Sequence, residues 1–265
     1  MHPVLVRIGP LTIHTYGVLV AAGFVLGLAL AVRLAKKEGL PAESIMDVGF
    51  WILLSAIVGS RLLFVIINAA HYSRHPLDII KIWEGGLVFY GGFALAVPVA
   101  IWYIKRHGLD CRSIADIFAP SLALGHAVGR LGCFSAGCCY GKPGQVPWAV
   151  TFIHPESFAR TGVPLHPTQL YESAGEFFCL LVLIKLRRHR VFRGQLFWTY
   201  VFLYAALRFS VEFFRGDEGR GFLIGGMSIS QGVSVVAGLV ALMIIVKGII
   251  AARADLMNTQ QEGQR

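Results

Sequence analysis

The sequence has few charged residues and many apolar ones. Of its 265 residues, 15% are charged and 55% are hydrophobic, whereas a soluble domain carries about 25% charged residues. The shortage of charge excludes an ordinary soluble domain, and the abundance of apolar residues excludes a disordered chain. The 30 glycines show no triplet period and there are no long heptad runs, which excludes collagen-like and coiled-coil folds. A polytopic membrane protein remains.

The chain also lacks the marks of cleavage, of a disulfide framework and of nucleic-acid binding. Residues 1–10 have no basic start and no small-residue cleavage site, so we expect the first apolar run to be a retained membrane helix. The 5 cysteines are odd in number, which disfavours a disulfide framework. We expect the net charge of +9 to reflect basic cytoplasmic loops, suited to anionic lipid head groups, rather than nucleic-acid binding.

Hydropathy predicts an all-α fold, a polytopic integral membrane bundle of about seven transmembrane helices. Residues 1–253 form one predicted membrane domain, and 254–265 form a short solvated tail. The longest connection, 136–169, contains scattered aromatic residues and is expected to be an ordered, folded-back segment. The predicted spans are 15–35, 46–69, 87–105, 114–135, 170–186, 196–214 and 226–247.

The distribution of lysine and arginine predicts the orientation of the bundle. Of the 24 such residues, fourteen lie after the first, third and fifth spans or in the C-terminal tail, and seven lie on the opposite side. Loops rich in these residues stay in the cytoplasm. The bias therefore predicts the N-terminus outside and the C-terminus inside, which requires an odd number of spans.

Three arginines fall inside predicted spans, namely Arg61, Arg130 and Arg208. A charge at the bilayer centre costs about 2.5–3.5 kcal/mol, so such residues normally face the bundle interior and have a partner. Tyr204, Arg208 and Glu212 share one helix face, and we expect the two charged residues to pair. A fixed guanidinium is well shaped to bind a phosphate. Structural ion pairs, or snorkelling to the interface, are the alternatives.

Three of the cysteines lie close together in the sequence, and their grouping allows more than one interpretation. Cys133, Cys138 and Cys139 lie within seven residues of the chain. A zinc site usually takes four ligands at spacings such as C-x2-C, and here only His154 or His166 is available as a second half. A metal site and a redox pair are therefore alternatives to a plain cluster of small residues near the outer membrane face. The spacing favours the plain cluster, with no metal and no cofactor.

Six segments, in this order along the chain, together resemble the bacterial prolipoprotein diacylglyceryl transferase family. The resemblance extends from about residue 8 to residue 250. The segments are HTYG at 14–17, GSR at 59–61, EGGLVFYGG at 84–92, GRLGCFSAGCCYG at 129–141, HPTQLYE at 166–172 and RFSVEFFR at 208–215.

The resemblance implies a seven-helix enzyme of the bacterial cytoplasmic (inner) membrane, with its active site toward the outer leaflet. Such an enzyme transfers diacylglyceryl from phosphatidylglycerol to the lipobox cysteine of a prolipoprotein and releases glycerol phosphate. This reaction is the first step of lipoprotein maturation and needs no nucleotide, cofactor or metal. The implied partners are phosphatidylglycerol, the prolipoprotein signal peptide and membrane lipids, without nucleic acid.

The resemblance also assigns site residues. Its candidate catalytic residues are Arg208, Glu212, Tyr90 and His166. Its candidate phosphatidylglycerol-binding residues are Arg130, Tyr16, Arg61, Gly91, Gly92, Cys133, Gly141 and Tyr204.

The chain departs from the family pattern at two places. Tyr90 stands where the family often has a histidine that has been proposed as the base, and tyrosine, with a pKa of about 10, is a poor base. Hydrogen bonding by Tyr90, the field of the arginines and proton transfer to His166 are the routes left open for activating the thiol. Cys133 stands where asparagine is usual, and Cys138 where an acidic residue is common.

Two functions of other classes remain open. A lipid or solute transporter would line its path with the same charged helices, although the chain shows no paired halves. A membrane thiol oxidoreductase would use Cys133, Cys138 and Cys139, and would lose activity when all three become serine.

Overall fold

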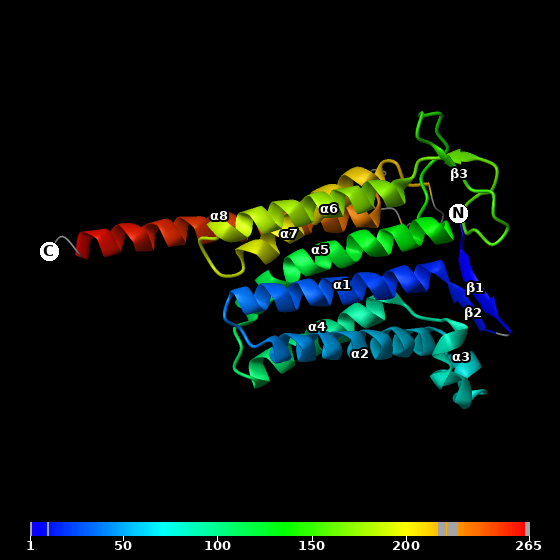
Figure 1. Ribbon diagram of the computed structural model, residues 1–265, viewed down its shortest axis with the longest axis horizontal. Helices are drawn as coiled ribbons and strands as arrows, with labels where there is room; N and C mark the ends of the chain where they lie inside the picture. Colours follow the sequence, from blue (N-terminus) through cyan, green and yellow to red (C-terminus); the bar gives the residue numbers. More distant parts are fainter. Residues whose placement is uncertain (1, 10, 217–220, 222–226, 263–265) are drawn as a thin grey trace. The chain divides into compact units, whose positions relative to one another are not determined.

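The computed structural model describes residues 2–9, 11–216, 221 and 227–262. The chain divides into two compact units, and Figure 1 shows the helices and strands coloured along the sequence. Unit 1 comprises Met1–Ala31 and Ala115–Arg265, and unit 2 comprises Val32–Ile114. Each unit is described by itself below.

Seven long helices dominate the described residues, and each coincides with one of the predicted stretches. They are α1 (Thr15–Lys37), α2 (Ala42–Ile67), α4 (Phe89–Arg106), α5 (Cys111–Ala136), α6 (Thr168–Leu186), α7 (Gln195–Glu212) and α8 (Ile229–Glu262). The short helices are α3 (Ala69–Tyr72), η1 (Pro76–Ile80), η2 (Ile82–Glu84) and η3 (Arg187–His189). Helix α8 continues well past the predicted end at 247, while residue 226, where that span was predicted to begin, lies outside the described residues.

Four helices in the described part of the chain are long and apolar enough to cross a membrane. They are α1, α2, α5 and the Ile229–Asp255 part of α8. Acidic and basic side chains lower the hydropathy of two of the other long helices, α6 and α7. The predicted all-α membrane protein is confirmed at this level.

Two small antiparallel sheets were not predicted. Strand β1 (Val4–Ile8) pairs with β2 (Leu11–His14), and β3 (Val150–Thr151) pairs with β4 (Pro164–Leu165). The second sheet lies in the connection between α5 and α6. There the buried residues Phe152, Ala159 and Leu165 form a small apolar core. The prediction that this connection is ordered is therefore confirmed.

Asp116 of α5 holds the start of α7. Its carboxylate accepts hydrogen bonds from the N–H groups of Gly194 (2.8 Å) and Phe197 (3.0 Å). A carboxylate at a helix N-terminus satisfies otherwise unpaired N–H groups and complements the helix dipole. The contact fixes α7, which carries Arg208, against α5, which carries Arg130.

Helices α2 and α4 of unit 2 meet at a pair of glycines. A Cβ atom added at Gly59 would lie 2.4 Å from the carbonyl oxygen of Gly91, and one at Gly91 would lie 2.3 Å from that of Gly59. Glycine alone leaves room for backbones this close.

We expect Gly59→Ala to lower the free energy of unfolding by about 1–3 kcal/mol, because the added methyl group overpacks this contact. Thermal unfolding in detergent measures the effect. Gly17→Ala is the control, since a Cβ there meets nothing within 4 Å. Equal stability of the two variants would contradict the prediction.

Candidate functional site

Five charged side chains form one cluster in unit 1, here called the Arg/Glu cluster. Its members are Arg130, Glu172, Arg208, Glu212 and Arg215. Glu172 is 2% exposed and lies at the centre. Its Oε2 is 2.5 Å from Nε of Arg130, and its Oε1 is 3.6 Å from Nη1 of Arg208 and 3.5 Å from Nη1 of Arg215. Arg208 also pairs with Glu212 at 2.7 Å, so the predicted pair is confirmed.

Glu172 was not predicted as a site residue. It ends the HPTQLYE segment, but nothing in that segment shows which basic residues it meets. The cluster combines α5, α6 and α7 with Arg215, which follows α7. Among these five side chains, three positive charges face two negative ones, an arrangement suited to an anionic ligand.

Arg130 is held through its Nε atom. This atom donates a hydrogen bond to Nε2 of His126 (3.1 Å) and is the nitrogen of Arg130 nearest to Glu172. Nδ1 of His126 lies 2.7 Å from Oε1 of Glu176, whose side chain is 0% exposed. Nη1 and Nη2 of Arg130 donate no hydrogen bond to any residue that the structure describes. The two terminal nitrogens therefore remain as paired donors for an oxyanion.

Two predicted tyrosines lie near Arg130. The ring of Tyr204 on α7 is 5.3 Å from that of His126, measured between centroids. Tyr16, at the start of α1, is 44% exposed and lies within electrostatic range of Arg130. Its backbone passes close to α5, since a Cβ at Gly132 would lie 3.2 Å from the Tyr16 carbonyl oxygen. Both tyrosines thus border the Arg/Glu cluster.

Gly141 and His166 meet in the connection between α5 and α6. The Gly141 N–H donates to the His166 carbonyl (3.0 Å), and a Cβ at Gly141 would lie 2.8 Å from the Phe214 carbonyl oxygen. Gly141 also forms a β-bridge with Arg215, so this glycine brings the connection against an arginine of the cluster. Nδ1 of His166 is 3.1 Å from the Tyr171 hydroxyl, and its ring lies 5.5 Å from that of Phe214.

The structure brings the three neighbouring cysteines together. The sulfur atoms of Cys133, Cys138 and Cys139 all lie within 4.8 Å of one another, and all three residues are partly exposed. Cys139 has φ 58°, the left-handed conformation, and is the single non-glycine residue with positive φ in the described ranges. Thr168 donates to its carbonyl and Gln169 to that of Cys138, each at 2.7 Å. The vicinal pair is therefore anchored to the start of α6.

These thiols are neighbours of the Arg/Glu cluster. The pKa of the Cys139 thiol lies well below its usual range, because the neighbouring thiols of Cys133 and Cys138 and the nearby guanidinium groups of Arg215 and Arg130 favour the thiolate. The thiols and the guanidinium groups consequently share one polar region of unit 1.

Four predicted site residues belong to unit 2. Tyr90 is 75% exposed. Gly91 and Gly92 lie against α2, where a Cβ at Gly92 would be 2.4 Å from the Ser60 hydroxyl. The contacts of Arg61, which is 7% exposed, are to loop backbone. Its guanidinium donates at 2.6–3.2 Å to the carbonyls of Asp78, Ile79, Gly85 and Gly86. These contacts account for the burial of Arg61 and for the glycines at positions 91 and 92 by packing alone. The lipid contacts predicted for these three residues stay predictions.

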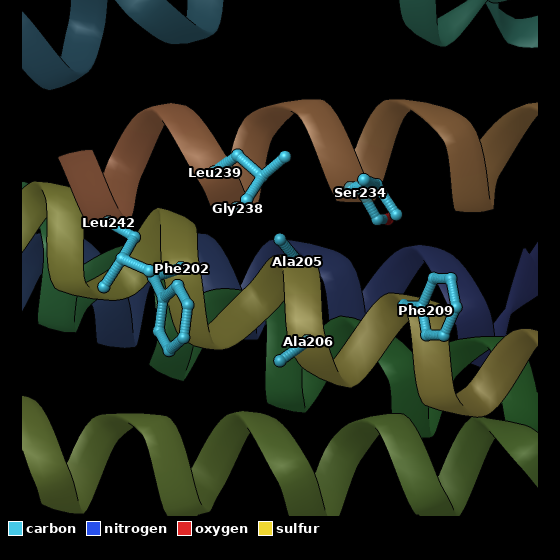
Figure 2. A pocket seen from close by; sticks show the side chains of 9 residues that line it. Phe202, Ala205, Ala206, Phe209, Ser234, Gly238, Leu239 and Leu242 are labelled. Atoms are coloured by element: carbon cyan, nitrogen blue, oxygen red, sulfur yellow. The ribbon is translucent and has the colours of Figure 1, made fainter.

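An apolar groove of about 260 Å³ lies between α7 and α8 (Figure 2). Arg208 Nη2 donates to the Ser230 hydroxyl (3.1 Å), and Ser234, one turn further along α8, is in the groove wall. The groove therefore begins about one helical turn from an arginine of the cluster. It is lined by Phe202, Ala205, Ala206, Phe209, Ser234, Val235, Gly238, Leu239 and Leu242.

Comparison with known proteins identifies the family. The model of the family described as prolipoprotein diacylglyceryl transferase matches residues 3–247. The chain belongs to this family. The resemblance predicted from the six segments is therefore confirmed, and with it membership of a family of transferases.

Three relatives show the extent of the similarity, and each is named phosphatidylglycerol–prolipoprotein diacylglyceryl transferase. The chain is 40% identical over 236 residues to that of Finegoldia magna, covering 89% of this chain and 88% of the relative. It is 34% identical over 250 residues to that of Bacillus velezensis (93% and 92% covered) and 35% identical over 257 residues to that of Limosilactobacillus reuteri (93% and 90% covered).

Proposed function

We propose that the chain transfers the diacylglyceryl group of phosphatidylglycerol to the lipobox cysteine of prolipoproteins and releases glycerol phosphate. The observation that carries the proposal is the way Arg130 is held. Its Nε meets His126 and Glu172, so its two terminal nitrogens are left to bind a phosphate beside Arg208. Family membership and the names of the relatives support the same donor and acceptor.

The Arg/Glu cluster fits the charge changes of this reaction. The acceptor thiolate attacks the glyceryl carbon that carries the phosphate oxygen, so a C–S bond forms and the C–O bond breaks. The electron pair of the broken bond leaves with glycerol phosphate. Arg130 and Arg208 stabilise this developing charge, and Glu172 and Glu212 keep the two guanidinium groups in place. The roles predicted for Tyr90, His166 and Cys133 remain part of the proposal.

We assign the apolar groove between α7 and α8 to an acyl chain of the lipid. Its near end lies about one turn from Arg208, so a lipid with its phosphate at the cluster would have its chains beside these helices. The lining is apolar except for Ser234. Burial of each methylene there contributes about 0.8 kcal/mol.

We expect Gly238→Leu to raise the KM for phosphatidylglycerol while changing kcat little, because the side chain fills the groove. The increase should be about fourfold for each methylene that is excluded. Steady-state kinetics with lipids of different chain length measure it. Gly238→Ala is the smaller step, since a Cβ there meets only the Ala205 Cβ, at 3.6 Å. Equal KM values for the two variants would contradict the assignment of an acyl chain to this groove.

We further propose seven membrane spans, with the N-terminus outside, the C-terminus inside and the site toward the outer leaflet of the bacterial cytoplasmic membrane. The bias of lysine and arginine supports this orientation. In α6 and α7 the charged side chains pair with one another inside unit 1, which allows these less apolar helices to cross. Residues 1–253 then form one membrane domain.

The test is transfer to a lipobox peptide. The chain, purified in detergent, receives phosphatidylglycerol and a peptide with one cysteine, and we expect that peptide to gain the mass of one diacylglyceryl group. A peptide with serine at that position should gain nothing. A folded protein that leaves the cysteine peptide unchanged would overturn the proposal in favour of a transporter or a thiol oxidoreductase.

A further inference from the structure

We propose that Cys133, Cys138 and Cys139 bind one zinc-like divalent cation and leave its fourth coordination position open for the thiol of the acceptor peptide. The metal site stands on the geometry of unit 1 alone. The assignment of the fourth position rests on the proposed function.

The thiols are spaced for such a cation. Zinc binds thiolate sulfur at about 2.3 Å, which puts neighbouring sulfur atoms of a tetrahedral site about 3.8 Å apart. The three sulfur atoms already lie within 4.8 Å of one another. Each pair of sulfur atoms therefore needs to approach by about 1 Å at most to complete the site. The bonds from Thr168 and Gln169 to the carbonyls of Cys139 and Cys138 hold the vicinal pair in place.

The three thiols leave one of the four coordination positions of the cation without a protein ligand. No histidine, aspartate or glutamate of the described residues joins the three thiols. All three cysteines are partly exposed, so an external ligand has access. Structural zinc sites are closed by four protein ligands, whereas catalytic ones have three and keep one position for water or substrate.

The surrounding charge favours the loaded site. Three thiolates and one divalent cation carry a net charge of −1, and Arg130 and Arg215 are close enough to act electrostatically on Cys139. A thiol that binds such a cation is deprotonated, and its proton passes to solvent. The acceptor cysteine is thereby presented as a thiolate beside the arginines that bind the phosphate, with no oxidant or reductant involved.

The first test measures the metal itself. The full chain in detergent, kept reduced and stripped with a chelator, is titrated with Zn²⁺ and with Cd²⁺. We expect one equivalent to bind, with a thiolate-to-cadmium charge-transfer band and three sulfur neighbours at the zinc absorption edge. Cys133→Ser and Cys138→Ser should weaken binding by at least the 10–100-fold that loss of a supporting residue costs. Cys111→Ser, remote in sequence from the cluster, should bind like the parent.

Two results would overturn the site: absence of sulfur-coordinated metal in the folded parent, or a disulfide within the cluster, seen as a loss of two hydrogens in the reduced preparation. Thermal unfolding of each variant separates a lost ligand from a lost fold. Metal binding by the parent protein is measured directly, so this test does not depend on whether a cysteine variant folds.

The second test concerns the acceptor. Adding the lipobox peptide should change the zinc environment from three to four sulfur neighbours, and the serine peptide should not. An unchanged sulfur count would overturn the assignment of the fourth position. Transfer at full rate by metal-free protein would support the proposed function and contradict a role of the metal in it. Four sulfur neighbours without any transfer would support the metal site and contradict the proposed function.

Discussion

Replacing Arg130 with alanine is expected to lower the rate of diacylglyceryl transfer by about 100–1,000-fold, the usual effect of removing one donor that stabilises a developing oxyanion. Its terminal nitrogens donate no hydrogen bond to a described residue, so the substitution removes two donors that the phosphate would use. The lipobox-peptide assay measures the loss, and thermal unfolding in detergent shows whether the variant is folded.

Two further variants make this result specific. Arg130→Lys keeps the charge but not the two parallel donors, so it should lie between alanine and the parent in rate. Arg106→Ala removes an exposed arginine at the end of α4 and should transfer at the parental rate. A folded Arg130→Ala protein with near-parental activity would exclude Arg130 from the phosphate site.

Replacing Glu172 with glutamine is expected to destabilise the protein by about 3–5 kcal/mol, the cost of leaving buried charges without their partner. The carboxylate is 2% exposed and faces Arg130, Arg208 and Arg215 at 2.5–3.6 Å. Glutamine has the same shape but cannot balance these charges. Thermal unfolding in detergent measures the loss, and Glu43→Gln, at an exposed position near the start of α2, should unfold like the parent.

A double variant separates stability from activity. In Glu172→Gln with Arg215→Gln, one positive charge is removed together with the negative one, so we expect part of the stability to return. Transfer should stay low, because the carboxylate that holds Arg130 and Arg208 is still missing. A Glu172→Gln protein as stable as the parent would show that the cluster does not depend on this carboxylate.

The local parts of the site could be predicted because they depend on spacing within one helix. Arg208 and Glu212 are one turn apart on α7, and their ion pair follows directly from that spacing. The seven helical stretches follow from apolar runs of suitable length. The two β-hairpins were missed because their strands are only 2–5 residues long, too short for a clear alternation.

The parts that join distant segments could not be predicted. Glu172 meets its arginines only when α5, α6 and α7 are packed together, and sequence spacing contains no information about that packing. The same holds for the cysteines. Their spacing disfavoured a metal site, yet the turn at Cys139 and the bonds from Thr168 and Gln169 bring all three sulfur atoms within 4.8 Å.

By itself, the sequence determined that this is a helical membrane protein of the prolipoprotein diacylglyceryl transferase family, because composition, hydropathy and ordered motifs are properties of the chain. Only the tertiary structure decided that Glu172 is the centre of the Arg/Glu cluster, that the terminal nitrogens of Arg130 donate no hydrogen bond to a described residue and that three thiols converge. The physical reason is that contacts among buried charges depend on how the helices pack, and that the convergence of the thiols depends on the turn at Cys139 and on its bonds to the start of α6.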